Sequence, residues 1–355
     1  METIMENLEY KFFSDINLND SFFNSLKEDY KEFSDWFIKK QSTQDAAYVL
    51  YNPMGTIEGF MYLKYEQEPI IDVNPPLPNG THLKIGTFKF ESAGTRRGER
   101  FIKKMFDIAF ENITDDIYVT IFPKHEYLTH LFIKYGFIIN GIKESGNGTE
   151  RVLTKILNEN RHDVLENYPR VDLNAQKYTL ALHPTFHSRM LPDSILNNES
   201  HDIIKDVSST NSIHKIYLCK MFDVTKFRRG DLLIIYRTGD GKGPANYRSV
   251  ITSLCVVEEI KDINEFPNLN SFLEYSKSYS IFEESELIRF YNTKEYPYII
   301  KFTYNTALKN RVTRERLINE VGISSSAYAG VIKLTDTQFR DMLTLGNVNE
   351  RFIIN

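Results

Sequence analysis

Residues 83–101 read LKIGTFKFESAGTRRGERF and hold the clearest structural signal in the chain. Residues 83–90 predict a strand, and residues 99–110 predict a helix with apolar side chains on one face and lysines on the other. The loop between them holds three arginines and Gly98. A helix N-terminus attracts anions, because its first N–H groups lack partners and the helix dipole adds positive charge. Since Gly98 lets the backbone approach a ligand closely, the loop predicts a binding site for a pyrophosphate.

The elements around this stretch indicate a domain that mixes helices and strands. Apolar side chains recur at helical spacing in residues 18–40. Two apolar runs, 47–50 and 59–64, flank a turn with Pro and Gly and predict a hairpin. Four prolines make residues 69–80 a loop. Downstream, the sequence predicts a strand at 117–122, a helix at 125–135 and strands at 137–142 and 151–156.

A second motif follows the loop, because residues 131–137 read LFIKYGF. Together, the loop and this motif resemble the GNAT (Gcn5-related) N-acetyltransferase family over about residues 10–156. In that family the loop reads Gln/Arg-x-x-Gly-x-Gly/Ala and binds the pyrophosphate of coenzyme A. The chain differs from the family at Thr95, where Gln or Arg is usual, and at Arg100, where Gly or Ala is usual. Phe132 stands where many members have a tyrosine that protonates the leaving thiolate.

The resemblance implies acetyl-CoA as the cofactor and acyl transfer to an amine as the reaction. It implies that a backbone N–H within residues 89–92 stabilises the charge that builds on the thioester oxygen. The residues that it places at the cofactor lie at the strand end, in the loop and at the helix start: Lys89, Phe90, Thr95, Arg96, Arg97, Gly98, Glu99, Arg100 and Phe101.

Acyl transfer also needs a base, because the amine must lose a proton before it attacks the thioester. Three candidate bases stand near the expected cofactor: Glu91 at the strand end, His125 at a helix start, and Glu66 after the strand 59–64. The candidate acids are Tyr135 and Tyr127, which belong to the same predicted helix. Each of these residues can equally be a surface, capping or core side chain without a catalytic role. The sequence therefore leaves the identity of the base and of the acid open.

The second half of the chain is rich in strand patterns and follows a polar segment at residues 158–175. We expect domains at 1–157 and 176–355, with this segment as a linker. Residues 227–238 (FRRGDLLIIYRT) and 247–259 (YRSVITSLCVVEE) predict two buried strands around a glycine-rich loop. They resemble the PUA-like superfamily, which includes ASCH and EVE domains, over about residues 176–340. The Gly-x-Lys-x-x-Glu-x-Arg signature of ASCH domains is missing from the sequence.

The expected fold class is therefore α+β, a GNAT-like mixed sheet flanked by helices and followed by a PUA-like β-barrel with helices. The PUA-like resemblance implies RNA or modified bases as ligands, which basic and aromatic side chains would contact. The candidate RNA-binding residues lie next to the two strands: Arg228, Arg229, Arg237, Lys242, Tyr247 and Arg248. His183 and His187 have a spacing compatible with a metal, but no Cys or acidic partner is in register, and no metal site is predicted.

Composition and charge limit the class of protein. The 355 residues are enough for two domains, and a charged fraction of 26% is that of a soluble protein. No apolar run approaches the ~18 residues of a membrane span. The first ten residues hold three glutamates and no basic residue before Lys11, which is unlike a signal peptide, and we expect a cytoplasmic protein. The net charge of −5 belongs to the first half, and neither half is strongly basic.

Three functions stay open at this stage. The first is an N-acetyltransferase that acts on RNA presented by the second domain. The second is an acetyltransferase for a protein or small-molecule amine, with the second domain as a specificity or dimer module. The third is a non-catalytic protein that binds coenzyme A or nucleic acid. An oligomer is compatible with each of them.

Overall fold

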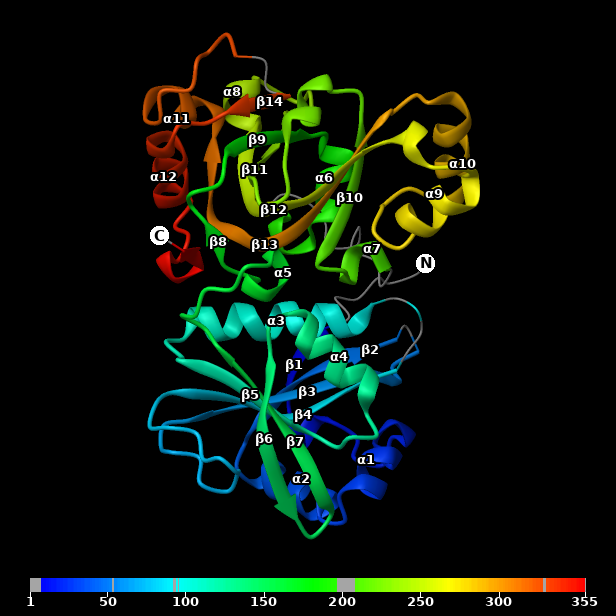
Figure 1. The fold of residues 1–355 in the computed structure, drawn as a ribbon, viewed down its shortest axis with the longest axis vertical. Coiled ribbons are helices and arrows are strands. Elements are labelled where there is room, and N and C mark those ends of the chain that lie inside the picture. The colour runs from blue at the N-terminus through cyan, green and yellow to red at the C-terminus, as the bar shows by residue number, and fades with distance from the viewer. Residues whose placement is uncertain are drawn as a thin grey trace. The chain divides into compact units, whose positions relative to one another are not determined.

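The computed structural model describes residues 8–52, 54–91, 94, 96–196, 208–327 and 330–354. The chain divides into two compact units (Figure 1). Unit 1 holds residues 1–93 and 97–161, and unit 2 holds residues 94–96 and 162–355. Each unit has a sheet of its own, so each is described by itself.

Unit 1 is built on a seven-stranded sheet in the order β1-β2-β3-β4-β5-β7-β6. Neighbouring strands are antiparallel except β4 and β5, which are parallel. The strands are β1 (Leu8–Phe12), β2 (Ala46–Tyr51), β3 (Ile57–Glu66), β4 (His82–Phe90), β5 (Asp116–Ile121), β6 (Ile138–Ser145) and β7 (Gly148–Ile156). This mixed sheet agrees with the expected α+β class.

Two pairs of helices accompany the sheet of unit 1: α1 (Asn24–Asp29), α2 (Phe33–Ser42), α3 (Arg97–Glu111) and α4 (Glu126–Lys134). Side chains of β3 alternate between the two faces of the sheet. Phe60 packs against Phe37 of α2, and Gly59 lies against the ring of Phe101 in α3. The helix expected at residues 18–40 is divided in two, because Tyr30 adopts an extended conformation (φ −129°, ψ 104°) after α1.

Unit 2 is built on a six-stranded sheet in the order β10-β13-β12-β11-β9-β14. Its strands are β9 (Lys177–Leu182), β10 (His214–Cys219), β11 (Leu232–Arg237), β12 (Val250–Asp262), β13 (Tyr298–Thr313) and β14 (Val331–Lys333). β9 and β11 are parallel, and the other pairs are antiparallel. A separate parallel pair joins β8 (Val171–Asp172) to β15 (Ile353–Ile354).

The closed β-barrel expected for this half is not shown. Register shifts between β12 and β13 bend the sheet, as bulges do. However, β10 and β14 remain its edges, and within the described part of the chain no strand pairing joins them. The supported description is therefore a mixed, open sheet with helices.

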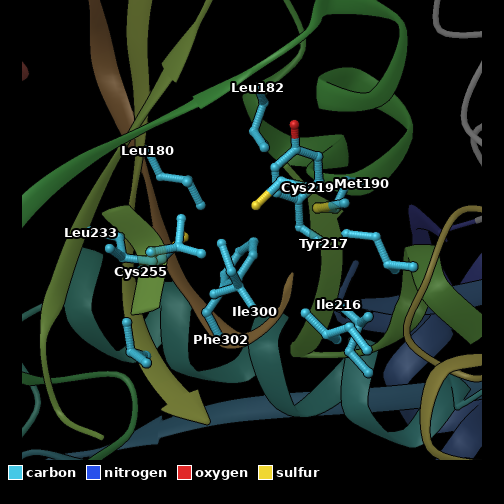
Figure 2. Packing of buried hydrophobic residues seen from close by; sticks show 14 of the residues in the cluster. Leu180, Leu182, Met190, Ile216, Tyr217, Cys219, Leu233, Cys255, Ile300 and Phe302 are labelled. Carbon is cyan, nitrogen blue, oxygen red and sulfur yellow. The ribbon is translucent and has the colours of Figure 1, made fainter. Parts of the chain in front are cut away.

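One face of this sheet carries a large apolar core (Figure 2). Side chains from β9, β10, β11, β12 and β13 meet there, among them Leu180, Ile216, Leu233, Cys255 and Phe302. The helices of unit 2 are α5 (Val164–Asn167), α6 (Pro184–Met190), α7 (Ser208–Asn211), α8 (Ala245–Arg248), α9 (Leu269–Ser276), α10 (Glu284–Thr293), α11 (Arg314–Asn319) and α12 (Asp336–Leu345).

Part of the segment expected as a linker, residues 158–175, packs within unit 2. Tyr168 is fully buried and donates a hydrogen bond from its hydroxyl to the carbonyl of Tyr304 at 2.8 Å. Val171 and Leu173 belong to an apolar cluster of the same unit. The domain boundaries themselves stay a prediction.

Candidate active site

The central feature of unit 1 is a parallel strand pair that separates after four residues. β4 pairs with β5 from His82 opposite Asp116 to Ile85 opposite Val119, and the pairing stops there. Both strands continue, β4 to Phe90 and β5 to Ile121. Beyond Ile85, N–H and C=O groups of β4 that face β5 therefore have no ladder partner in the described part of the chain. Unpaired backbone groups inside a sheet can bind an extended polar ligand.

A cavity of about 460 Å³ lies along this separation. Its lining includes Gly86, Thr87 and Phe88 of β4 and Thr120 and Ile121 of β5. Aromatic side chains of other elements complete the walls, namely Tyr30, Phe33, Trp36, Tyr62 and Phe122. A volume of this size and a mixed lining suit a small polar ligand with an apolar part.

His125, one of the candidate bases, lines this cavity together with Asp29. Its Nε2 lies 2.9 Å from Oδ2 of Asp29. Because a carboxylate only accepts hydrogen bonds, Nε2 carries the hydrogen, and in the neutral ring Nδ1 is then an acceptor. Burial alone would raise the pKa of Asp29, but hydrogen bonds from Lys124 and His125 outweigh it and lower this pKa. The ionised Asp29 therefore orients the ring.

Glu66, the second candidate base, also lines the cavity but is held by other side chains. Tyr118 donates its hydroxyl hydrogen to Oε2, and Lys64 lies 2.7 Å from Oε1. Burial would raise the pKa of Glu66, yet these two hydrogen bonds and the charge of Lys84 hold it below the usual range. A carboxylate with a lowered pKa is a weak base, so its environment favours a binding role over a catalytic one.

The other candidates lie outside this lining. Glu91 is exposed at the end of β4 and forms an ion pair with Lys89 at 3.4 Å. Tyr135 is fully buried, where it can protonate only a group that reaches the core. Tyr127 is 69% exposed on α4. Of the sequence candidates, the structure brings only His125 and Glu66 to the cavity.

Several polar residues of the cavity were not predicted from the sequence, among them Asp29, Tyr30 and Glu150. The hydroxyl of Tyr30 donates to Oε1 of Glu150 at 2.7 Å, across 120 positions of the chain. Burial first, then the neighbouring carboxylate, raises the pKa of Tyr30, so the tyrosine keeps its proton. Only the pairing of β5 with β7 brings Glu150 to this place, and no local motif marks it.

The predicted cofactor loop begins α3, as expected, but several of its side chains bind protein partners. Arg97 is buried and forms an ion pair with Glu58. Glu99 is buried and lies 3.2 Å from Nζ of Lys134. Phe101 is in the core. These three side chains therefore position the helix, and their backbone N–H groups are what they can offer to an anion.

Gly98 is closely packed against other side chains of the protein. A Cβ at this position would lie 2.6 Å from Cζ of Phe90 and 2.9 Å from Cδ2 of Leu131. The sequence predicts that Gly98 allows a close ligand approach, and the structure supplies a second reason for its small size. Phe90, a predicted cofactor residue, thus acts at least as a wall for the helix start.

Arg96 and Arg100 are the partly exposed arginines of the loop. Arg96 has a positive φ of 56°, which turns the chain just before α3. Lys89 donates to the carbonyl of Phe22. Thr95 lies outside the described residues. The guanidinium of Arg96 lies 4.2 Å from the centroid of the Tyr279 ring, so this side chain already has a protein contact.

The candidate RNA-binding residues do not form one patch. Arg228 and Arg229 are exposed before the start of β11, whereas Arg237 is buried at its end. Lys242 and Tyr247 are exposed beyond that end, and Arg248 forms an ion pair with Asp240. The two groups stand at opposite ends of a six-residue strand, about 20 Å apart at ~3.3 Å per residue. RNA binding remains a prediction.

Comparison with known proteins adds structural neighbours but no family assignment. No family model and no curated protein matches the chain. Solved structures that resemble it include ASCH from Zymomonas mobilis, at 10% identity and a TM-score of 0.30, covering 48% of this chain and 94% of that one. They also include a GNAT family acetyltransferase from Elizabethkingia anophelis with acetyl-CoA bound, at 14% identity and a TM-score of 0.31, covering 43% and 99%.

The chain is similar to both. The sequence resembles the same two classes, the GNAT family in its first half and the PUA-like superfamily, which includes ASCH, in its second half. Within the described ranges, no helix is long and apolar enough to cross a membrane.

Proposed function

We propose that the first half of the chain, residues 1–157, is an acetyl-CoA-dependent N-acetyltransferase. The observation that carries this proposal is the separation of β4 and β5 beside the cavity. Such a separation exposes backbone N–H and C=O groups inside a sheet, where an extended amide-containing arm such as that of coenzyme A finds partners. The start of α3, with Arg96 and Arg100, suits the pyrophosphate of the same molecule.

The reacting groups follow from the cavity lining. Acetyl-CoA, when bound, supplies an acetyl group activated as a thioester. Nδ1 of His125 accepts a proton from the acceptor amine, while Asp29 fixes the ring through Nε2. The N–H groups of β4 beyond Ile85 stabilise the negative charge that develops on the carbonyl oxygen. Phe132 is fully buried and has no acidic hydrogen, so water or the protonated His125 returns a proton to the thiolate.

Calorimetry with acetyl-CoA tests the proposal. We expect the full chain to bind acetyl-CoA, and the double variant Arg96→Glu, Arg100→Glu to bind it at least tenfold more weakly, since two favourable contacts become repulsive. Lys242→Glu, an exposed change in unit 2, is the matched control and should bind like the wild type. No binding by the wild type, or equal loss in the control, would reject the proposed cofactor site.

The proposal leaves the role of the second half open to a direct test. If residues 176–355 present RNA to the transferase, RNA binding must weaken steeply with salt. Two variants test the two ends of β11: the double variant Arg228→Glu, Arg229→Glu at its start and Lys242→Glu beyond its end. We expect RNA binding to weaken in the variant whose end of β11 contacts the RNA. Filter binding of labelled total RNA at two salt concentrations measures this, and salt-independent retention would exclude an electrostatic RNA interface.

A further inference from the structure

Two charged side chains of the unit 1 cavity are incompletely compensated by the protein. Glu150 lines the cavity, is only 3% exposed and accepts one side-chain hydrogen bond, from the hydroxyl of Tyr30. Within the described part of the chain, no Lys, Arg or His forms an ion pair with it. Lys143 of β6 lies opposite Glu150 in the pairing of β6 with β7, but Nζ of Lys143 lies 2.6 Å from Oδ2 of Asp72 and forms its ion pair there. A buried carboxylate without a cation is costly, and such a cost is usually kept for a ligand.

Lys84 is the complementary case at the other end of the cavity. Its nearest carboxylate oxygen, Oε1 of Glu66, lies 3.9 Å away, beyond hydrogen-bond distance. That carboxylate already binds Lys64 and Tyr118. Burial lowers the pKa of Lys84, which agrees with an ammonium that the protein solvates poorly. An anionic ligand group would complete its surroundings.

We propose that the acceptor is a primary amine that also carries an anionic group several bonds away, with its ammonium bound by Glu150 and its anion by Lys84. This inference rests on the proposed function, because it names the substrate class of the same cavity. The strand register gives the scale. Lys84 lies opposite Tyr118 of β5, and Glu150 lies one position beyond the pair of Arg151 with Ile121. The two positions differ by four residues along β5, about 13 Å at ~3.3 Å per residue.

That spacing disfavours a simple α-amino acid as the ligand of both groups, because its ammonium and carboxylate are attached to the same carbon. It suits an amine at the end of a flexible chain, with a carboxylate or a phosphate at the other end. The order also suits the reaction. Glu150 stands beside the separated part of β5, close to His125 in the same lining, whereas Lys84 stands beside the paired part. Trp36 and Tyr62 belong to the same lining and offer apolar surface for the aliphatic chain.

Binding of four probes to the full chain tests the proposal by calorimetry: 6-aminohexanoate, 3-aminopropyl phosphate, hexylamine and hexanoate. We expect one of the two zwitterionic probes to bind roughly tenfold or more tightly than hexylamine and hexanoate. The better of the two distinguishes a carboxylate from a phosphate. Similar affinities for all four probes, or no binding of any of them, would overturn the proposal.

Two variants assign the ends of the ligand. Glu150→Gln keeps an acceptor for Tyr30 and should remove the advantage over hexanoate, whereas Lys84→Met should remove the advantage over hexylamine. Lys31→Met, an exposed change outside the lining, is the control and should change neither. Loss of both advantages in either variant would contradict the assignment.

The stability of Glu150→Gln separates a binding role from a structural one. Because the substitution removes an uncompensated buried charge, its melting temperature should equal or exceed that of the wild type. A melting temperature lower by several degrees would make Glu150 a structural residue and overturn the proposal. Acetyl-CoA binding, measured in the same samples, shows whether the proposed function fails separately.

Discussion

His125 in unit 1 and His187 in unit 2 both bind neighbouring side chains, yet their surroundings are opposite. The side chain of His125 is 45% exposed, lines a cavity, and uses one ring nitrogen on Asp29. His187 is fully buried, and its two ring nitrogens lie 3.2 Å from Oγ of Ser188 and 2.8 Å from Oγ1 of Thr252. A polar side chain indicates function when the protein leaves part of its hydrogen-bonding capacity free beside a cavity.

The contrast extends to the residues around each histidine. From Thr252 in unit 2, hydrogen bonds continue through Ser253 at 3.1 Å and Ser194 at 2.7 Å to the hydroxyl of Tyr304 at 2.7 Å. All members of this chain are buried, so each satisfies the next and the network fixes one packing arrangement. In the cavity of unit 1, by contrast, Glu150 accepts one side-chain hydrogen bond, from Tyr30, and Lys84 lies 3.9 Å from the carboxylate of Glu66.

The largest effect is expected from His125→Gln. If Nδ1 of His125 accepts the proton of the amine, its loss should lower kcat by about 10²–10⁴-fold. The free energy of unfolding should change by less than about 0.5 kcal/mol, because the side chain is half exposed. Release of coenzyme A with 6-aminohexanoate as acceptor measures the first, and urea unfolding the second. Unchanged turnover would place the base elsewhere and break the contrast between the two histidines.

His187→Leu should show the reverse behaviour. Removing the ring takes one hydrogen bond from each of the buried hydroxyls of Thr252 and Ser188 and disturbs a fully buried network, which should cost about 2–4 kcal/mol of unfolding free energy. Turnover by unit 1 should stay the same at temperatures where both units are folded. The double variant with Thr252→Val should recover part of the loss, because it removes both partners of one hydrogen bond. Full stability in the single variant would show that the network is not structural.

Gly98→Ala should have a smaller effect, about 1–3 kcal/mol on the stability of unit 1, because the new Cβ collides with Phe90 and Leu131. Phe90→Leu in the same chain should relieve part of the collision. If the double variant regains stability and binds acetyl-CoA normally, packing alone requires the glycine. If stability returns but acetyl-CoA binding does not, the ligand also needs Gly98, and the prediction of a close ligand approach is confirmed.

The sequence was sufficient for elements whose signals are local. The strand at residues 83–90, the helix after the loop and the strand at 117–122 agree with β4, α3 and β5. His125 and Glu66, two of the predicted bases, line the cavity, and their catalytic roles stay a prediction. Glu150 and Asp29 were not predicted, because each depends on strand or helix packing across about a hundred residues. The prediction for Gly98 was incomplete for a similar reason, because only the fold brings the ring of Phe90 against this glycine.

The smallest effect concerns pH and tests whether Asp29 is ionised beside His125. A carboxyl pKa that is lower in the folded state stabilises the protein above the unfolded pKa of ~3.9, and this contribution is lost as pH falls through the folded pKa. Because Lys124 and His125 are largely exposed, the contribution is at most about 1 kcal/mol. Asp29→Asn should therefore reduce the urea midpoint at pH 7 and lose this difference below pH ~4. Asp35→Asn, exposed on α2, is the control. A difference that persists unchanged at low pH would mean that Asp29 acts through packing, and His125 would then lack an ionised partner to orient its ring.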